Sequence, residues 1–237
     1  FVQDAVLINY FGKVFFGEFV FFASLIQIIA IIGVCGQNNF IVFLSSKYKK
    51  CSQPSLIPHA VILGVLVALI GTIFLSLIVM VLNYMVFHKS EVSLPLVFVT
   101  SAMFGVFEVV RQTFRTISKE GITDSLSLIC VPSTVIIVTL FFSFFDIDYL
   151  LDHPDYLYSF AVFVVLIITV VIFISEKPGF KDLPLKEFRK PFANSVSMNR
   201  LRLVWFKRGV PLTVSGLFTT FQQRIDVVIL GVFINSE

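Results

Sequence analysis

The closing stretch of the chain reads FKRGVPLTVSGLFTTFQQRIDVVILGVFINSE over residues 206–237, and it decides how the remaining sequence is interpreted. From residue 209 to residue 233 it is apolar and long enough to cross a bilayer, since a transmembrane helix needs about 20 residues. Arg224 and Asp226 nevertheless lie well inside this segment. Charged side chains within a membrane are costly, and they usually face a bundle interior or a watery cavity. The stretch therefore predicts a membrane helix that carries a structural or a functional polar site.

The composition of the whole chain indicates the same class of protein. Of its 237 residues 57% are hydrophobic and only 14% are charged, against about 25% in a soluble domain. The mean hydropathy is +0.94. At about 20 residues per crossing the chain has room for about six or seven helices, so we predict an all-α polytopic membrane protein. The first residue is Phe1 and no signal-peptide pattern follows it, so we expect the chain to begin inside a longer protein.

Apolar runs place the expected crossings. Residues 19–46 contain no charged side chain, and residues 56–87 form a second run that is interrupted only by His59. Each run predicts one spanning helix, tilted or extended past the membrane. The other crossings expected are the end of a helix over residues 1–11 and helices that start at residue 95 and that cover residues 125–145, 156–175 and 209–233.

The charge of the loops alternates along the chain. Basic loops follow every second helix, at residues 47–50, at 111–119 and at 176–208, the last with nine Lys or Arg against three acids. The loops between them hold only Lys13 and Lys89 as cations. By the positive-inside rule the basic loops are predicted to be cytoplasmic. Because topology explains the excess of positive charge, no nucleic-acid partner is expected.

The basic segment over residues 176–208 has two interpretations. One is a solvated linker that orients the bundle, and the other is a surface helix that touches anionic lipid headgroups. The cations concerned are Arg200, Arg202, Lys207 and Arg208. Trp205 beside Phe206 is typical of the aromatic belt at a membrane interface.

The polar residues of the last helix form a second cluster of interest. Arg224 and Asp226 are two positions apart, so they lie on different sides of an α-helix and cannot pair along one face. Gln222 and Gln223 precede them. The cluster is either a network that locks this helix to a neighbour or the lining of a substrate cavity. A weak internal repeat sets Asp4 on Asp226, at an offset of 226 − 4 = 222 residues, so Asp4 has the same two interpretations.

A third group of charges lies near the inner end of the helix that starts at residue 95. Glu108, Arg111 and Arg115 are spaced i, i+3 and i+7, so they share one face. One interpretation is a Glu108–Arg111 pair with Arg115 extended into the headgroup layer. The other is a cationic inner mouth that attracts an anionic headgroup, because the guanidinium fork suits phosphate.

Motifs for metal binding and catalysis are weak or absent in the sequence. Asp146, Asp148, His153 and Asp155 superficially resemble a site for a divalent ion, but they lie in one short loop, and we expect no metal there. The three cysteines are far apart and support neither a disulfide framework nor a metal site. No GxSxG, HExxH, P-loop or dinucleotide-binding motif occurs, so neither catalytic residues nor a cofactor are expected.

Two stretches resemble a known family. Residues 11–19, with Phe-Gly followed by Phe-Gly-Glu-Phe, resemble the outer turn after the first helix of polysaccharide-biosynthesis flippases. These are the Wzx-type members of the multidrug/oligosaccharidyl-lipid/polysaccharide exporter superfamily. The start of their seventh helix resembles the pattern made here by Gly209, Pro211, Leu212, Asp226, Ile229 and Gly231.

The resemblance implies a division of the chain into three parts. Residues 1–175 would hold the end of helix one and helices two to six of an N-terminal lobe. Residues 176–208 would be the basic cytoplasmic loop between lobes, and residues 209–237 would be helix seven, at the start of a second lobe.

The resemblance also implies a function. Such a flippase carries an undecaprenyl-diphosphate-linked oligosaccharide across the bacterial inner membrane by alternating access, for O-antigen, lipopolysaccharide or other surface polysaccharides, and it is not an enzyme. Arg224 would be a contact for the diphosphate, while Asp226 and Asp4 would form hydrogen bonds or bind H⁺ or Na⁺ as a coupling ion. The substrate-path residues would also include Gln222, Gln223, Glu108, Arg111 and Arg115. Other expected partners are membrane lipids and further polysaccharide-assembly proteins.

Three other functions stay open. A cation-coupled multidrug antiporter of the same superfamily would use the intramembrane acids for its coupling ion. A membrane glycosyltransferase or polymerase would use the aspartates of residues 146–155, although such enzymes usually have a large outer loop and every outer loop here is short. A scaffold protein without transport activity is the third.

Overall fold

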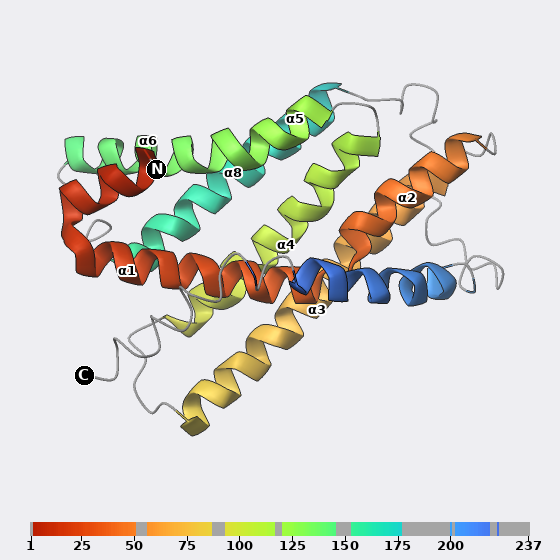
Figure 1. Ribbon diagram of the computed structural model, residues 1–237, viewed down its shortest axis with the longest axis horizontal. Helices are drawn as coiled ribbons and strands as arrows, with labels where there is room; N and C mark the ends of the chain where they lie inside the picture. Colours follow the sequence, from red (N-terminus) through yellow and green to blue (C-terminus); the bar gives the residue numbers. More distant parts are fainter. Residues whose placement is uncertain are drawn as a thin grey trace.

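The computed structural model describes residues 2–50, 56–86, 93–116, 120–145, 153–176, 200, 202–218 and 222, and these residues are almost entirely helical (Figure 1). In chain order they form α1 (Val2–Gly33), α2 (Gln37–Lys50), α3 (Leu56–Val86), α4 (Leu94–Thr116), α5 (Glu120–Ser125), a π-helical turn (Leu126–Cys130), α6 (Val131–Phe144), α8 (Pro154–Glu176) and a helix over residues 202–218. No strand occurs in this part of the chain. The prediction of an all-α fold is confirmed.

Four of the described helices are long and apolar enough to cross a membrane. Their apolar spans are Phe11–Gly33, His59–Val81, Pro95–Arg115 and Pro154–Phe173, and Val131–Phe144 is a shorter apolar helix. Ile70 and Phe74 of α3 are 67% and 63% exposed, as expected for a surface that faces lipid rather than water. The protein is therefore a multi-pass membrane protein.

The first reversal of the chain occurs within α1, at a single residue. Gly12 has φ 87° and ψ 173°, which is a backbone conformation that essentially only glycine adopts. Figure 1 shows the first segment of α1, in red, turning back at this point before the rest of α1 runs along the bundle. The helix end expected over residues 1–11 is present, and the helix that follows it begins directly after Gly12.

The run over residues 19–46 forms two helices, so the prediction of one uninterrupted helix there is wrong. α1 ends at Gly33 and α2 begins at Gln37. Cys35 and Gly36, with φ 50° and 68°, adopt the left-handed conformation that ends helices. The absence of charged residues hid this break, since side chains on both sides of it are buried.

The core is built around α4, which packs against α1, α2, α3 and α8. One cluster of buried side chains joins α1, α4, α6 and α8 and includes Phe22, Phe107 and Leu157. A second cluster joins α2, α3 and α4 to Trp205 of the helix over residues 202–218. Trp205 is only 2% exposed, so the expectation that it lies in an interfacial belt is wrong. It fastens its helix to the bundle instead.

The last described helix starts earlier than the sequence indicates. It runs from residue 202, within the segment expected to be a loop, and it includes Gly209, where helix seven was expected to begin. Residues 219–221 and 223–237 lie outside the described part of the chain. The division into one lobe, a loop and the start of a second lobe remains a prediction.

Candidate functional site

The charged face of α4 holds a buried ion pair. Arg111 Nη2 donates a hydrogen bond to Glu108 Oε2 at 2.7 Å, and the two side chains are only 13% and 11% exposed. The guanidinium carbon also lies 6.0 Å from the centroid of the Phe107 ring, within the range of a cation–π contact. The pair predicted from the i, i+3 spacing is therefore present. Removing one partner of such a buried pair typically costs about 3–5 kcal/mol, because the other charge is left uncompensated.

Arg115, the last residue of this face, also has an ion-pair partner. Arg115 Nη2 donates to Asp124 Oδ1 of α5 at 3.0 Å, with the two side chains 40% and 54% exposed. Exposed pairs of this kind contribute about 0.2–1 kcal/mol. The sequence pointed to Arg115 but not to Asp124, since a separation of nine residues across the end of a helix is not a recognisable pattern.

Helix geometry fixes the direction in which this face points. Thr100 of α4 donates to Ser159 of α8 at 2.6 Å, whereas Ser101 lies 2.8 Å from Ser76 of α3, measured between hydroxyl oxygens. Successive residues of an α-helix are about 100° apart, so Glu108, Arg111 and Arg115 project between these two directions. We call these three residues the α4 polar row. It lies on the side of α4 between α3 and α8.

A buried amide continues the polar character of α4. The Gln112 side chain is 5% exposed, and its Oε1 has no hydrogen-bond partner among the residues that the structure describes. Unpaired polar atoms are rare in protein interiors. Gln112 was not singled out from the sequence, where a glutamine next to charged residues is typical of an ordinary helix end.

A second site that sequence analysis missed lies at the break between α1 and α2. Gln37 is 1% exposed, and its Nε2 lies 3.4 Å from the carbonyl oxygen of Phe206 and 3.5 Å from that of Cys35. A side-chain carbon at Gly36 would overlap the carbonyl oxygen of Gly209, and it would lie 2.7 Å from the backbone nitrogen of Thr213. The turn and the helix over residues 202–218 therefore approach each other as closely as backbones can. We call this contact the Gly36–Gly209 junction.

Most of the polar residues that were singled out near the chain ends lie outside the described part of the structure. Gln222 is described and exposed, while Gln223, Arg224 and Asp226 lie outside the described residues. Asp4 belongs to the first segment of α1, and its side chain also lies outside the described part. The structure thus brings together Glu108, Arg111 and Arg115, and their assignment to a substrate path remains a prediction.

The described residues contain no group of three or more His, Cys, Asp or Glu that could hold a metal ion. His153 and Asp155 are described at the start of α8, whereas Asp146 and Asp148 lie outside the described ranges.

These features define a multi-pass helical membrane protein with ionic groups buried in its bundle. Comparison with protein families narrows this class. The chain matches the model of the polysaccharide biosynthesis protein family over residues 1–237, and it belongs to that family. No curated protein and no solved structure gave a significant match.

Proposed function

We propose that this chain is part of a flippase that moves a lipid-linked oligosaccharide across the membrane. The observation that carries the proposal is the match to the polysaccharide biosynthesis family over the whole chain. The multi-pass helical architecture supports it, because transport of a lipid-linked sugar requires a path through the bilayer. The specific substrate proposed is an undecaprenyl-diphosphate-linked oligosaccharide in the bacterial inner membrane, with the basic loops in the cytoplasm.

The charges of the α4 polar row argue for a supporting role in this transport. Arg111 and Arg115 each have a carboxylate partner within 3.0 Å. A diphosphate would have to displace Glu108 or Asp124 before it could bind either guanidinium. We therefore assign the α4 polar row to holding α4 in the bundle near the inner end of the path.

The proposed contact for the diphosphate is Arg224 in the last helix. Asp226 and Asp4 are proposed to bind H⁺ or Na⁺ as a coupling ion, with Gln222 and Gln223 as hydrogen-bond donors and acceptors along the path. A carrier of this kind needs no covalent catalysis, because it must bind its substrate in both access states without trapping either.

The test uses the full-length gene in a strain that lacks its own flippase. Arg224→Ala should reduce surface glycan display by about tenfold or more at unchanged protein level, since a hydrogen bond to a charged group contributes about 1.5–3 kcal/mol. Lipid-linked oligosaccharide should accumulate in the inner leaflet. Arg115→Ala is the matched control, because it removes the same side chain from an exposed pair and should leave display near the wild-type level.

Two outcomes would contradict parts of the proposal separately. Normal display with Arg224→Ala would remove Arg224 from the substrate path while leaving the flippase assignment intact. If the wild-type gene failed to restore display but exported cationic dyes in a proton- or sodium-dependent manner, the chain would belong to a multidrug antiporter instead.

A further inference from the structure

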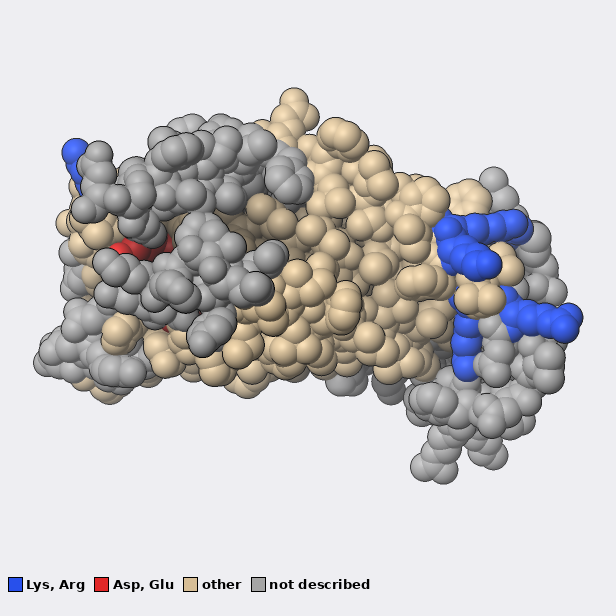
Figure 2. All heavy atoms as spheres, turned by 90° about the horizontal axis from the view of Figure 1, so that it is seen from below, with Lys and Arg blue, Asp and Glu red and all other residues tan. Residues whose placement is uncertain are grey.

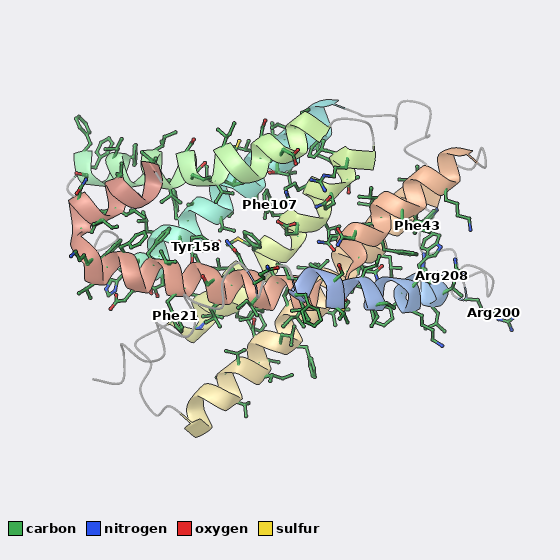
Figure 3. All side chains as sticks on the ribbon, viewed as in Figure 1. Phe21, Phe43, Phe107, Tyr158, Arg200 and Arg208 are labelled. Carbon is green, nitrogen blue, oxygen red and sulfur yellow. The ribbon has the colours of Figure 1, made fainter. Side chains whose placement is uncertain are left out.

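Many of the described cations lie at one end of the molecule. Most of the lysine and arginine side chains visible in Figure 2 are at that end, while the acidic side chains visible in that view lie at the opposite end. Figure 3 places Arg200 and Arg208 at the start of the helix over residues 202–218, at the edge of the bundle. We define the basic surface as Arg200, Lys207 and Arg208, all of which are exposed.

The basic surface has no compensating acids within the described chain. Neither Arg200, Lys207 nor Arg208 forms an ion pair with a described residue. This contrasts with Arg111 and Arg115, each of which has a carboxylate partner. The charge of the basic surface is therefore available to a ligand from outside the protein.

The same helix carries an exposed apolar stripe. Leu203, Val210, Val214 and Phe218 are 54%, 42%, 53% and 74% exposed. Together with Lys207 they follow the spacing of one helix face, so Lys207 lies on a face that is otherwise hydrocarbon, and Arg208 adjoins that face. This order suits a helix that enters a bilayer, with its basic start at the level of the lipid headgroups.

The opposite face of the helix is fixed to the protein. Trp205 is 2% exposed in the cluster of α2, α3 and α4, and Gly209 is in backbone contact with the turn after α1. The basic surface is thus carried on a docked helix and not on a free linker. Because the backbone that carries these cations is already held in place, binding a ligand costs less entropy.

We propose that the basic surface binds the phosphodiester headgroups of anionic membrane phospholipids. These are resident lipids of the bilayer, so the inference goes beyond the proposed transport of a lipid-linked sugar. Charge complementarity selects the ligand, and the adjacent apolar stripe selects a lipid over a soluble anion, because acyl chains can cover Leu203, Val210 and Val214. The bound headgroups hold the start of this helix at the membrane surface.

The experiment measures lipid binding to the purified full-length protein. The protein is placed in micelles of neutral detergent and titrated with phosphatidylglycerol, phosphatidylcholine or inorganic phosphate, and bound lipid is counted by native mass spectrometry. We expect phosphatidylglycerol to bind at least about tenfold more tightly than phosphatidylcholine. The difference should shrink as salt rises from about 0.05 M to 0.5 M, because the Debye length falls well below 10 Å.

Substitutions locate the binding to this surface. Arg208→Gln should weaken binding of phosphatidylglycerol several-fold, and Lys207→Gln combined with Arg208→Gln should weaken it by about tenfold or more. Lys13→Gln, which removes the same charge from an exposed side chain distant from the basic surface, is the matched control and should bind as the wild type does. Each variant is first shown to keep the wild-type thermal midpoint in phosphatidylcholine. If the double variant does not fold, the single Arg208→Gln comparison with Lys13→Gln decides.

Three results would overturn the inference. The first is equal affinity for phosphatidylglycerol and phosphatidylcholine. The second is wild-type binding of phosphatidylglycerol by the Arg208 variants. The third is displacement of bound phosphatidylglycerol by an equal concentration of inorganic phosphate. The last would show a site for a free anion in place of a lipid surface. None of these outcomes bears on surface glycan display, so the inference and the proposed flippase function fail independently.

Discussion

Two glycines with positive φ interrupt the helices at the start of the chain, and their surroundings are opposite. Gly12 kinks α1 at φ 87°, and a side-chain carbon added there would meet no atom within 4 Å. Gly36 lies in the turn between α1 and α2 at φ 68°, where an added carbon would overlap the backbone of the helix over residues 202–218. Gly12 is thus required for its backbone conformation alone. Gly36 is required for both conformation and close packing.

The difference distinguishes a local bend of the chain at Gly12 from a contact between distant parts of the sequence at the Gly36–Gly209 junction. Gly12 reverses the direction of the first segment without bringing two helices into backbone contact. Gly36 brings the end of α1 against a helix that follows about 170 residues later (209 − 36 = 173). Gly33 and Gly71 make a similar approach between α1 and α3, since a side-chain carbon at Gly33 would lie 2.6 Å from the backbone nitrogen of Thr72. Small residues at such crossings are how membrane helices pack closely.

The largest effect is expected for Gly36→Ala. The substitution combines the strain of a positive φ, about 1–2 kcal/mol, with overlap against backbone atoms that have little room to move. We expect a loss of about 3 kcal/mol or more, which lowers the thermal midpoint of the purified full-length protein by roughly 10 °C. The helix over residues 202–218 should also become more accessible to protease. An unchanged midpoint would show that the Gly36–Gly209 junction does not form.

A smaller effect is expected for Gly12→Ala. The backbone at φ 87° and ψ 173° is strained for any residue with a side chain, while the space around it is open. The loss should therefore be about 1–3 kcal/mol, or roughly 2–10 °C in the same thermal measurement. Gly17→Ala is the control, because Gly17 is equally open but has no positive φ, and alanine there should be neutral or slightly stabilising. Equal losses at the two positions would remove the strain argument.

The sequence predicted the elements whose signals are local. The apolar runs over α3 and α8 gave the crossings, and the i, i+3 spacing gave the Glu108–Arg111 pair. The resemblance of two short stretches to polysaccharide-biosynthesis flippases is confirmed at the level of the family. For the crossings and the Glu108–Arg111 pair, neighbours in sequence are also neighbours in space.

The sequence could not predict the features that depend on distant partners. The break after Gly33 is marked in the sequence only by Gly36 and the polar residues 37–39 within an uncharged run, and glycine is also common inside membrane helices. Gln37 is buried, and one partner of its amide is the carbonyl oxygen of Phe206 at 3.4 Å, which is 169 residues away in the sequence. Trp205 is typical of a membrane interface by residue type, but its place in the core is set by α2 and α3. A pattern within one helix contains no information about such contacts.

The smallest effect is expected for Gly209→Ala, and this substitution is the most specific test of the Gly36–Gly209 junction. Gly209 is helical, so alanine adds no strain, and helix propensity favours it by up to about 1 kcal/mol. The added carbon overlaps the amide of Gln37, which is the end of a flexible side chain and can move, and it lies 3.3 Å from the carbonyl oxygen of Cys35. Moving the amide removes its contacts with Phe206 and Cys35, so we expect a net loss of about 1 kcal/mol or less.

A double-mutant cycle with Gln37→Ala separates these terms. Once the amide is absent, Gly209→Ala should become neutral or stabilising, which gives a coupling of about 1 kcal/mol between the two positions in the thermal measurement. Gly216→Ala on the same helix is the control, since its added carbon would meet only Ile31 at an ordinary 3.6 Å, and it should behave alike with and without Gln37. If Gly209→Ala is equally destabilising in both backgrounds, the Gln37 amide does not set the approach of the two backbones. The difference between the surroundings of Gly36 and those of Gly12 would then rest on backbone overlap at the Gly36–Gly209 junction alone.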